Sequence, residues 1–356
     1  MKRKKAIDFL TVTLFFGVLL SFTIYLGLGA MLDTEDEDVL GGNLVSVNQS
    51  FFEDSILGEF VKFCDYKIFK HIDDTEMIIG KDEWLFEAVD SSCGYERLLD
   101  YVGGCPLSEE ELSRIESVMI QRAAAYQEKG INYLMVVIPD SITVCSDKVP
   151  SYLGRQSENT RLGCLARYLS AQAAYSFVNP TRMMIDQRGE IPMYNNTENS
   201  INAYGAYLIY DAAVSRYAFN TGIDVERLQL DEVEFYTRVT DGRSVAVKAG
   251  LGKTIKNRTV SLSDSMPQNY TVTTGEKGMI TTFRTDVVSR GVQNVVVECS
   301  DEWVRTQLMP FFSNTFEGVY YKSDLSKTAE DNTTLSPTLV VQIIHESELA
   351  ALAKSD

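Results

Sequence analysis

The sequence contains only two histidines, His71 and His345, and this limits the catalytic chemistry that it can support. A serine hydroxyl becomes a useful nucleophile when a neighbouring base, usually an imidazole, removes its proton and an acid orients that base. His345 directly follows an apolar run typical of a buried strand, so we interpret it as structural. His71 lies in the segment that leads into the domain, and a catalytic role there is the less favoured interpretation.

The cysteines do not have metal-ligand spacing. No CxxC motif occurs, and with two histidines a zinc site is not expected. Cys93 with Cys105, and Cys145 with Cys164, are the pairs that proximity suggests for disulfides, while free buried thiols are the open alternative. The six cysteines are Cys64, Cys93, Cys105, Cys145, Cys164 and Cys299.

Two other polar segments resemble ligand-binding motifs but do not have the spacing that those motifs need. The five acids within 33–38 suit a solvated spacer better than a calcium site. The run Gly250–Thr254 reads GLGKT, but a phosphate-binding GxxxxGK[ST] loop would need glycine where Val247 stands. We therefore expect no metal ion and no cofactor.

The N-terminus has the charge pattern of a single-pass membrane anchor. Basic residues crowd the first five positions, and the 24 uncharged residues from Phe9 to Leu32 follow. As a helix this run would extend roughly 36 Å, enough to cross a bilayer core of about 30 Å. Because positive charge stays cytoplasmic, we expect a cytoplasmic tail at 1–8, an anchor at 9–32 in the cell membrane, and an extracytoplasmic body. A cleaved signal peptide, with Gly27 and Gly29 at the cleavage site, is the alternative.

The exported body is strongly acidic. The chain carries a net charge of −17, and residues 1–30 carry +3 from four basic residues and Asp8, so the remainder carries −20. Such a body repels phosphate backbones, and nucleic acid is not an expected partner. Residues 33–50 are acidic and then rich in glycine and asparagine, as in a linker, and 51–356 are long enough for one large domain.

Helices and strands alternate in this domain. Ser108 and Glu111 form a capping box that opens a helix ending before Gly130, and the apolar run 131–138 then suits a central strand of a parallel sheet. The same alternation of helices and strands recurs after residue 138. Before the first of these helices, a strand–turn–strand pair is expected at 77–86. These later elements are helices at 162–174, 204–217 and 301–312, a last helix ending at Ala353, and strands at 175–178, 294–298, 319–321 and 339–344.

This alternation predicts an α/β fold with a doubly wound parallel sheet flanked by helices. Residues 232–290 differ, because they are rich in valine, threonine, tyrosine and glycine with frequent turns. We expect them to form a β-rich antiparallel insertion.

Four segments in this order resemble the DHHW family and the AlgX/AlgJ-like proteins, a branch of the SGNH hydrolase superfamily. Residues 79–86 are similar to the pattern GKDGWLF, and 131–153 to a strand followed by the loop vPdK…lP. Residues 194–207 stand where that family reads YyrTDHHWt.yGAY, and 295–321 where it reads RDSF…L.PfL…F..v.y. The resemblance implies the SGNH-like α/β fold and enzymes that esterify or de-esterify sugars of exported polysaccharides.

The positions that carry catalysis in that family are altered. Aligned on Gly205-Ala206-Tyr207, its aspartate corresponds to Glu198, its two histidines to Asn199 and Ser200, and its tryptophan to Ile201. Trp303 stands at the nucleophile position, and a shifted strand end would instead present Ser300, followed by Asp301. The other positions that we select within the matched motifs, as binding candidates, are Asp140, Ser141, Asn202, Tyr204 and Trp303.

Three hypotheses follow. The favoured one is a non-catalytic relative that binds a cell-surface glycan or an envelope partner. The second is an active acetyltransferase or acetylesterase that uses Ser300 or Ser200 beside a membrane O-acyltransferase. The third is an envelope assembly protein of unrelated fold. Glycosidase-type chemistry, with Glu198 and a distant carboxylate, is a minor alternative because no feature identifies the second acid.

Overall fold

The computed structural model describes residues 17, 66, 76–90, 94–189, 191–266, 268–274, 280–285, 293–323 and 336–354. The chain divides into two units, Met1–Val61 and Lys62–Asp356, and almost all described residues belong to the second. The predicted tail, anchor and linker lie outside the described residues except for Gly17, which is helical. His71 also lies outside them. Within the described part, no helix has the length and apolar character needed to cross a membrane.

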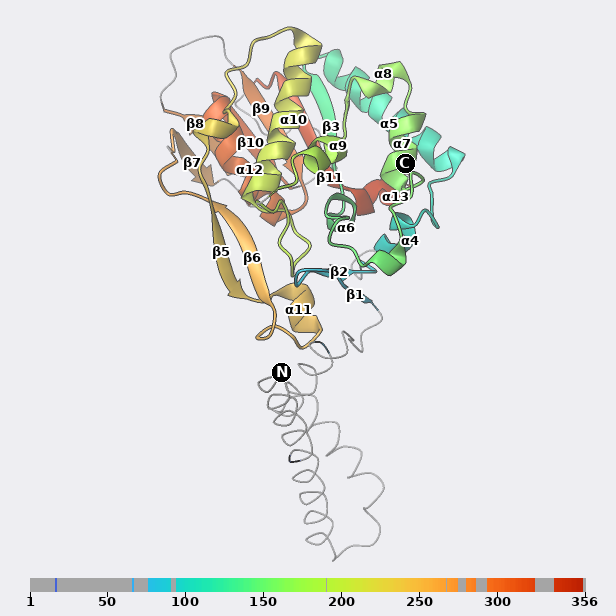
Figure 1. Cartoon of the computed structure of the whole chain (residues 1–356). Coiled ribbons are helices and arrows are strands. Elements are labelled where there is room, and N and C mark those ends of the chain that lie inside the picture. The colour runs from blue at the N-terminus through green and yellow to red at the C-terminus, as the bar shows by residue number, and fades with distance from the viewer. Residues whose placement is uncertain are drawn as a thin grey trace, which may run out of the picture. The chain divides into compact units, whose positions relative to one another are not determined.

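The second unit is a mixed α/β domain built on a seven-stranded, mostly parallel sheet (Figure 1). The strand order is β4-β3-β11-β9-β10-β8-β7, in which the first five strands are mutually parallel and the pairings of β8 with β10 and with β7 are antiparallel. The strands of this sheet are β3 (Asn132–Ile138), β4 (Phe177–Val178), β7 (Tyr270–Thr274), β8 (Ile280–Arg284), β9 (Asn294–Cys299), β10 (Gly318–Lys322) and β11 (Leu339–His345).

Helices cover both faces of the sheet. One core cluster packs α10 and α12 against residues such as Val136 and Val297, and the other packs α5 against Met135 and Val137 on the opposite face. The long helices are α5 (Glu109–Gln127), α10 (Ala203–Thr221) and α12 (Glu302–Thr315). Shorter helices are α4 (Arg97–Tyr101), α6 (Ser141–Val144), α7 (Arg161–Tyr168), α8 (Ala171–Ala174), α9 (Thr181–Asp186), α11 (Ser244–Lys248) and α13 (Leu349–Leu352), with single 3₁₀ turns η2 (Ser151–Leu153), η3 (Leu230–Glu232) and η5 (Glu346–Glu348).

Local sequence signals set the ends of the long helices. The predicted capping box opens α5, because Ser108 accepts from the Glu111 amide and Glu111 accepts from the Ser108 amide. Asn202 caps α10 by accepting from the amides of Tyr204 and Gly205 in its first turn. At the other end of α10, Gly222 takes the left-handed conformation, with φ of 69°, that glycine adopts readily.

Two predicted segments differ in detail from the structure. The helix expected at 162–174 is two helices, α7 and α8, because Ser170 caps the second and ends the first. Residues 232–290 contain two antiparallel strand pairs. One is the separate hairpin of β5 (Phe235–Asp241) and β6 (Lys256–Leu262), and the other, β7 with β8, extends the main sheet beyond β10.

A tight turn joins the short strands β1 (Met77–Ile79) and β2 (Leu85–Glu87). Gly80 has to be small, because a Cβ there would lie 2.8 Å from the Lys148 carbonyl oxygen. The turn residues Asp82 and Glu83 both have positive φ, 54° and 65°. Positive φ is uncommon for residues other than glycine, and Glu83 lacks the short side chain that makes it tolerable for aspartate.

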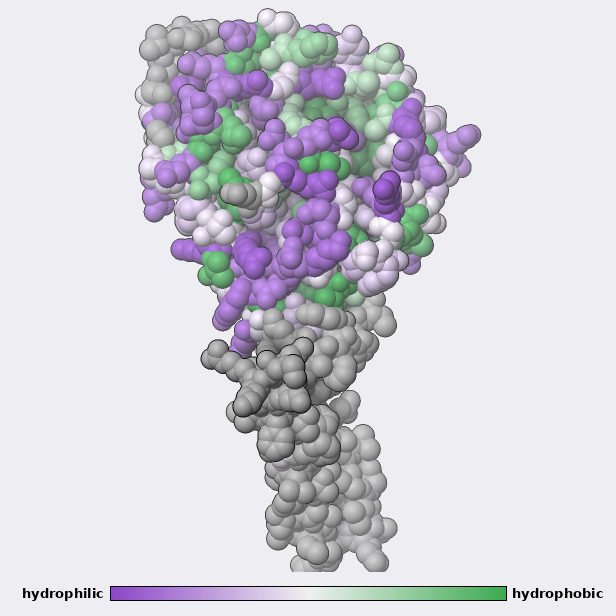
Figure 2. Space-filling view, in the orientation of Figure 1, coloured by the Kyte–Doolittle hydropathy of each residue, from purple (hydrophilic) through white to green (hydrophobic). Residues whose placement is uncertain are grey.

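The described cysteines are not bridged. Cys105, Cys145, Cys164 and Cys299 carry free thiols, so the suggested Cys145–Cys164 disulfide is wrong, and Cys93 lies outside the described residues. Burial raises the pKa of Cys145 and Cys299, which makes their thiolates rare and their thiols slow to react. On the face drawn in Figure 2, the apolar residues form separate patches within a largely hydrophilic surface.

Candidate functional site

The carboxyl ends of three neighbouring strands place the matched motifs at one edge of the sheet. Strands β3, β11 and β9 are parallel neighbours, with His345 beside Ile138 and Ile343 beside Cys299. His345, the last residue of β11, and Asp140 and Ser300, which come just after β3 and β9, therefore lie at the same edge. In open α/β sheets this edge is where ligands bind.

Ser300 and the one described histidine, His345, lie close together without forming a nucleophile–base pair. Ser300 Oγ donates to Oε1 of Glu348 at 3.2 Å. His345 Nε2 lies 3.0 Å from Oδ2 of Asp301. The backbone amide of His345 donates to Oε2 of Glu348 at 2.7 Å, so Glu348 contacts both Ser300 and His345. No described imidazole is hydrogen-bonded to Ser300.

The Asp301–His345 pair shifts both pKa values. Burial alone would lower the pKa of His345, but its hydrogen bond to Asp301 and the charge of that carboxylate outweigh burial and raise it. Burial would raise the pKa of Asp301, and hydrogen bonds from His345 and from the α12 backbone outweigh it, so this pKa is lowered. Asp301 also caps α12 by accepting the Val304 amide. Both residues therefore hold the start of α12 and the end of β11 together.

The loop 194–201 carries the other motif positions. Asn195 Nδ2 donates to Glu198 Oε2 at 2.8 Å and contacts Ser200 Oγ at 3.0 Å, and Ser200 Oγ is 3.5 Å from the same carboxylate oxygen. Arg243 lies 3.7 Å from the other oxygen of Glu198. Ser200 is thus surrounded by an amide and a carboxylate, and no described imidazole contacts it.

Asn199 occupies an unusual position in this loop. Its φ is 57°, a conformation that asparagine tolerates better than most residues. Its Oδ1 accepts from the Ser141 hydroxyl at 2.8 Å, which joins the loop to α6. Its Nδ2 is buried and has no hydrogen-bond partner within the described part of the chain. Buried donors are nearly always satisfied, so this amide is an exception within the described loop.

The candidate residue Asp140 belongs to a buried ionic network. Its carboxylate accepts from Arg97 at 3.2 Å, and its amide donates to Glu346 at 3.0 Å. Burial raises the pKa of Glu346 well above its ordinary value, and the charges of Asp140 and Asp100 raise it further. These contacts fix the end of β3 rather than leaving Asp140 open to a ligand.

The remaining candidates divide into buried and exposed residues. Asn202 is fully buried and donates to the Pro192 carbonyl in addition to capping α10. Tyr204 is buried as well and packs edge-on against Phe235 with ring centroids 5.3 Å apart. Trp303 differs, because it is 38% exposed and its Nε1 donates to the Ile201 carbonyl at 2.7 Å. Trp303 therefore brings α12 and the motif loop together and still presents part of its ring to solvent.

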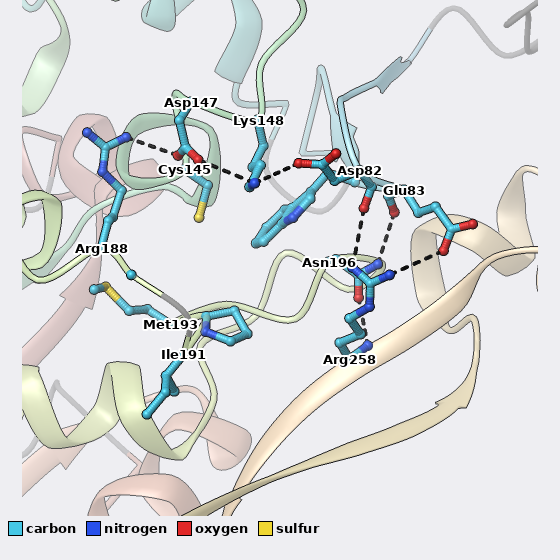
Figure 3. A pocket seen from close by; sticks show the side chains of 13 residues that line it. Asp82, Glu83, Cys145, Asp147, Lys148, Arg188, Ile191, Met193, Asn196 and Arg258 are labelled. Atoms are coloured by element: carbon cyan, nitrogen blue, oxygen red, sulfur yellow. Dashed lines mark hydrogen bonds and ion pairs between the residues drawn. The ribbon is translucent and has the colours of Figure 1, made fainter.

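A pocket of about 470 Å³ has part of its wall in the same loop as the motif positions. No pattern in the sequence predicted it. It is bounded by the β1–β2 turn, the segment after α6, the segment after α9, and β6 (Figure 3). Asn196, from the same loop as Glu198, is part of its wall. Four distant segments form the pocket, so no local pattern in the sequence could indicate it.

Two solved structures share this architecture. Bacillus cereus PatB1 with a sulfonyl adduct superposes with a TM-score of 0.56 at 14% identity, over 80% of this chain and 98% of PatB1. A DHHW family protein from Eubacterium siraeum superposes with a TM-score of 0.50 at 12% identity, over 78% of this chain and 97% of that protein. This chain has the DHHW-protein fold.

The DHHW-protein fold confirms the architecture that the four motifs implied and excludes the hypothesis of an unrelated fold. The O-acetyltransferase domain of Pseudomonas putida AlgJ is a more distant match, with a TM-score of 0.46 at 14% identity over 79% of this chain and 95% of AlgJ, and the assignment does not depend on it. No protein-family model and no curated protein sequence matches the chain.

Proposed function

We propose that this protein is a non-catalytic member of the SGNH-like group that acts in the O-acetylation of a cell-surface polysaccharide by binding the glycan. The observation that carries the proposal is the set of partners of the two candidate nucleophiles. Ser200 contacts Asn195 and Glu198, and Ser300 contacts Glu348. No imidazole of the described residues contacts either hydroxyl, and a serine without such a base is not activated for attack on an ester.

The expected effect of this loss is large. Removing members of a catalytic triad typically lowers the rate by a factor of roughly 10⁴–10⁶. A carboxylate such as Glu348 is a much weaker base than the imidazole that normally accepts a serine proton. The ring of His345, the described imidazole at the same edge, is hydrogen-bonded to Asp301. Turnover by such a site would be negligible beside that of an intact triad.

Glycan binding is supported by the aromatic and polar side chains that stand at the motif positions in place of the catalytic groups. Trp303 presents part of an indole to solvent at the edge of the sheet, and Asn199 holds an unpaired amide donor in the adjoining loop. An aromatic ring next to a few fixed polar groups is the usual composition of a small-molecule site. A sugar ring, with an apolar face and hydroxyls at its rim, matches this composition.

The proposal includes a location and a partner. The basic N-terminus and the apolar run 9–32 support a single-pass anchor with the domain outside the cytoplasm. A membrane O-acyltransferase is the partner that would supply or use acetyl groups at this surface. The resemblance of the four motifs to DHHW and AlgX/AlgJ-like proteins is the basis for this context.

A second candidate function rests on one contact. Ser300 Oγ and Glu348 Oε1 are 3.2 Å apart, which is hydrogen-bonding distance for a serine and a carboxylate that would act as its base. In this alternative the protein is an acetylesterase or acetyltransferase with a displaced nucleophile. The same experiment separates the two candidates.

The experiment compares hydrolysis of p-nitrophenyl acetate and release of acetate from acetylated xylan by the purified full chain and its variants. The proposal expects Ser300→Ala and Glu348→Gln to retain the background rate of the parent protein. Ser117→Ala, which removes an exposed hydroxyl on α5, is the matched control. If Ser300→Ala and Glu348→Gln abolish turnover while Ser117→Ala does not, the enzyme alternative replaces the proposal.

Binding is tested through Trp303 fluorescence. The chain contains two tryptophans, so Trp84→Phe leaves Trp303 as the sole indole. Titration of this variant with xylan fragments should change the emission of Trp303, and Asn199→Ala should weaken the response. If the emission of Trp303 does not change with acetylated or deacetylated fragments, the glycan-binding part of the proposal is wrong.

A further inference from the structure

The pocket is separate from the motif positions that carry the proposed function. None of Glu198, Ser200, Ser300 or Trp303 lines it. Figure 3 shows Lys148 and Asp147 on one side, Arg258 and Asn196 on another, and the space between them. A volume of about 470 Å³ is within the range of small-molecule sites.

Four ion pairs join six side chains around the pocket. Lys148 contacts Asp82 at 2.7 Å and Asp147 at 3.6 Å, Arg188 contacts Asp147 at 3.0 Å, and Arg258 contacts Glu83 at 3.6 Å. All six side chains are partly exposed, so their remaining hydrogen-bonding positions can reach a bound molecule. The three positive and three negative charges cancel, and the pocket is neutral in a chain whose net charge is −17.

Below this ring of charges the lining is apolar. Trp84, Cys145 and Met193 are buried residues of the wall, and Ile191 and Pro192 line it nearby. Burial raises the pKa of the Cys145 thiol, which therefore remains neutral. The pocket thus combines an apolar base with a rim that offers both hydrogen-bond donors and acceptors.

The turn that supplies two of the carboxylates is held in an unfavourable backbone conformation. Asp82 and Glu83 have φ of 54° and 65°, and their side chains contact Lys148 and Arg258. In the motif pattern GKDGWLF, glycine stands where this chain has Glu83, and glycine would adopt this φ without strain. A strained residue whose side chain reaches a pocket is typical of a functional site.

We propose that this pocket binds a neutral sugar residue, with the ring face on the apolar base and the hydroxyls hydrogen-bonded to the ion pairs of the rim. A hydroxyl donates and accepts, so it can bridge a carboxylate and a cation without separating them. The three cations and three anions of the rim balance, so the rim favours neither sign of ligand charge. The site is additional to the one formed by Trp303 and Asn199.

The test uses a variant in which Trp84 is the only tryptophan. Trp303→Phe leaves Trp84, which lines the pocket, as the sole indole of the full chain. Titration with glucose, N-acetylglucosamine and cellobiose at millimolar concentration is expected to change its emission with at least one of them. Glucuronate and glucosamine are expected to bind more weakly. If no neutral sugar changes the emission, or if a charged sugar binds best, the proposal is overturned.

Two substitutions locate the binding in the pocket. Glu83→Gly and Arg258→Gln in the Trp303→Phe variant should each weaken binding by about tenfold, because each removes a charged hydrogen-bonding group. Arg182→Gln, which alters an exposed cation on α9, should leave it unchanged. If Glu83→Gly and Arg258→Gln have no more effect than the control, binding occurs elsewhere and the proposal is overturned. A negative result with Trp303 fluorescence concerns the proposed function and does not affect this outcome.

Discussion

Replacing Glu83 with glycine and, separately, with alanine measures the strain in the β1–β2 turn. Both substitutions remove the carboxylate and every contact that it makes, so the difference between the two variants reflects the backbone alone. At the observed φ of 65°, a residue with a Cβ costs about 1–2 kcal/mol relative to glycine. Glycine loses about 0.4–1 kcal/mol through the greater entropy of its unfolded chain. The glycine variant should therefore be the more stable by about 1 kcal/mol.

The assay is urea unfolding of the two variants, followed by far-ultraviolet circular dichroism, with equal slopes required before the midpoints are compared. Gln121, exposed in the middle of α5, is the control site. There the glycine variant should be the less stable by roughly 0.8–1 kcal/mol relative to alanine. If alanine at residue 83 proves as stable as glycine or more so, the turn is not strained at that residue, and the argument from strain to function fails.

Three further predictions concern the motif loop and the end of β11. Asn202→Ala should destabilise the protein by about 2 kcal/mol, since it removes a helix cap and leaves a buried carbonyl unpaired, as measured by urea unfolding. Gly205→Ala should destabilise it more, because the new Cβ would lie 2.4 Å from the Met193 carbonyl oxygen; a loss below that of Asn202→Ala would contradict this. Asp301→Asn keeps the helix cap but removes the charge that stabilises protonated His345. Because folding raises the pKa of His345, the Asp301–His345 charge interaction stabilises the protein fully below a pH of about 6.5 and is lost as the pH rises through the raised pKa. In acid the interaction is lost when Asp301, whose pKa is lowered, becomes protonated. The variant should thus lose more stability at pH 5.5 than at pH 9, and an equal loss would show that the pair contributes no charge interaction.

Much of the fold could be predicted because its signals are local. The capping box at Ser108 and the apolar run that becomes β3 depend on residues within a few positions of each other. The pairing of β8 with β10 could not be predicted in this way. It joins Gly318 to Phe283, across a long stretch of sequence, and no local pattern records which strand a β-rich segment will extend.

The candidate site was predictable only in part, for a related reason. Alignment of the motif placed Glu198 and Ser200 in one loop, and the structure brings them within hydrogen-bonding reach of each other. The pairing of Asp301 with His345 was not anticipated, because it depends on β9 and β11 being neighbours in the sheet. Trp303, expected at a nucleophile position, instead fastens α12 to the loop through its indole nitrogen.

The loop 194–201 is held at both ends by different parts of the molecule. Asn196 binds the Glu83 carbonyl beside the pocket, whereas Asn199 binds Ser141 at the edge of the sheet. A ligand that displaces the loop at one end must therefore perturb the other end. Where such a displacement makes occupancy of the pocket change affinity at the Trp303 edge, thermodynamic linkage requires that occupancy of that edge change affinity in the pocket by the same factor. The two ends would behave as a cooperative pair, with one short peptide segment as the coupling element.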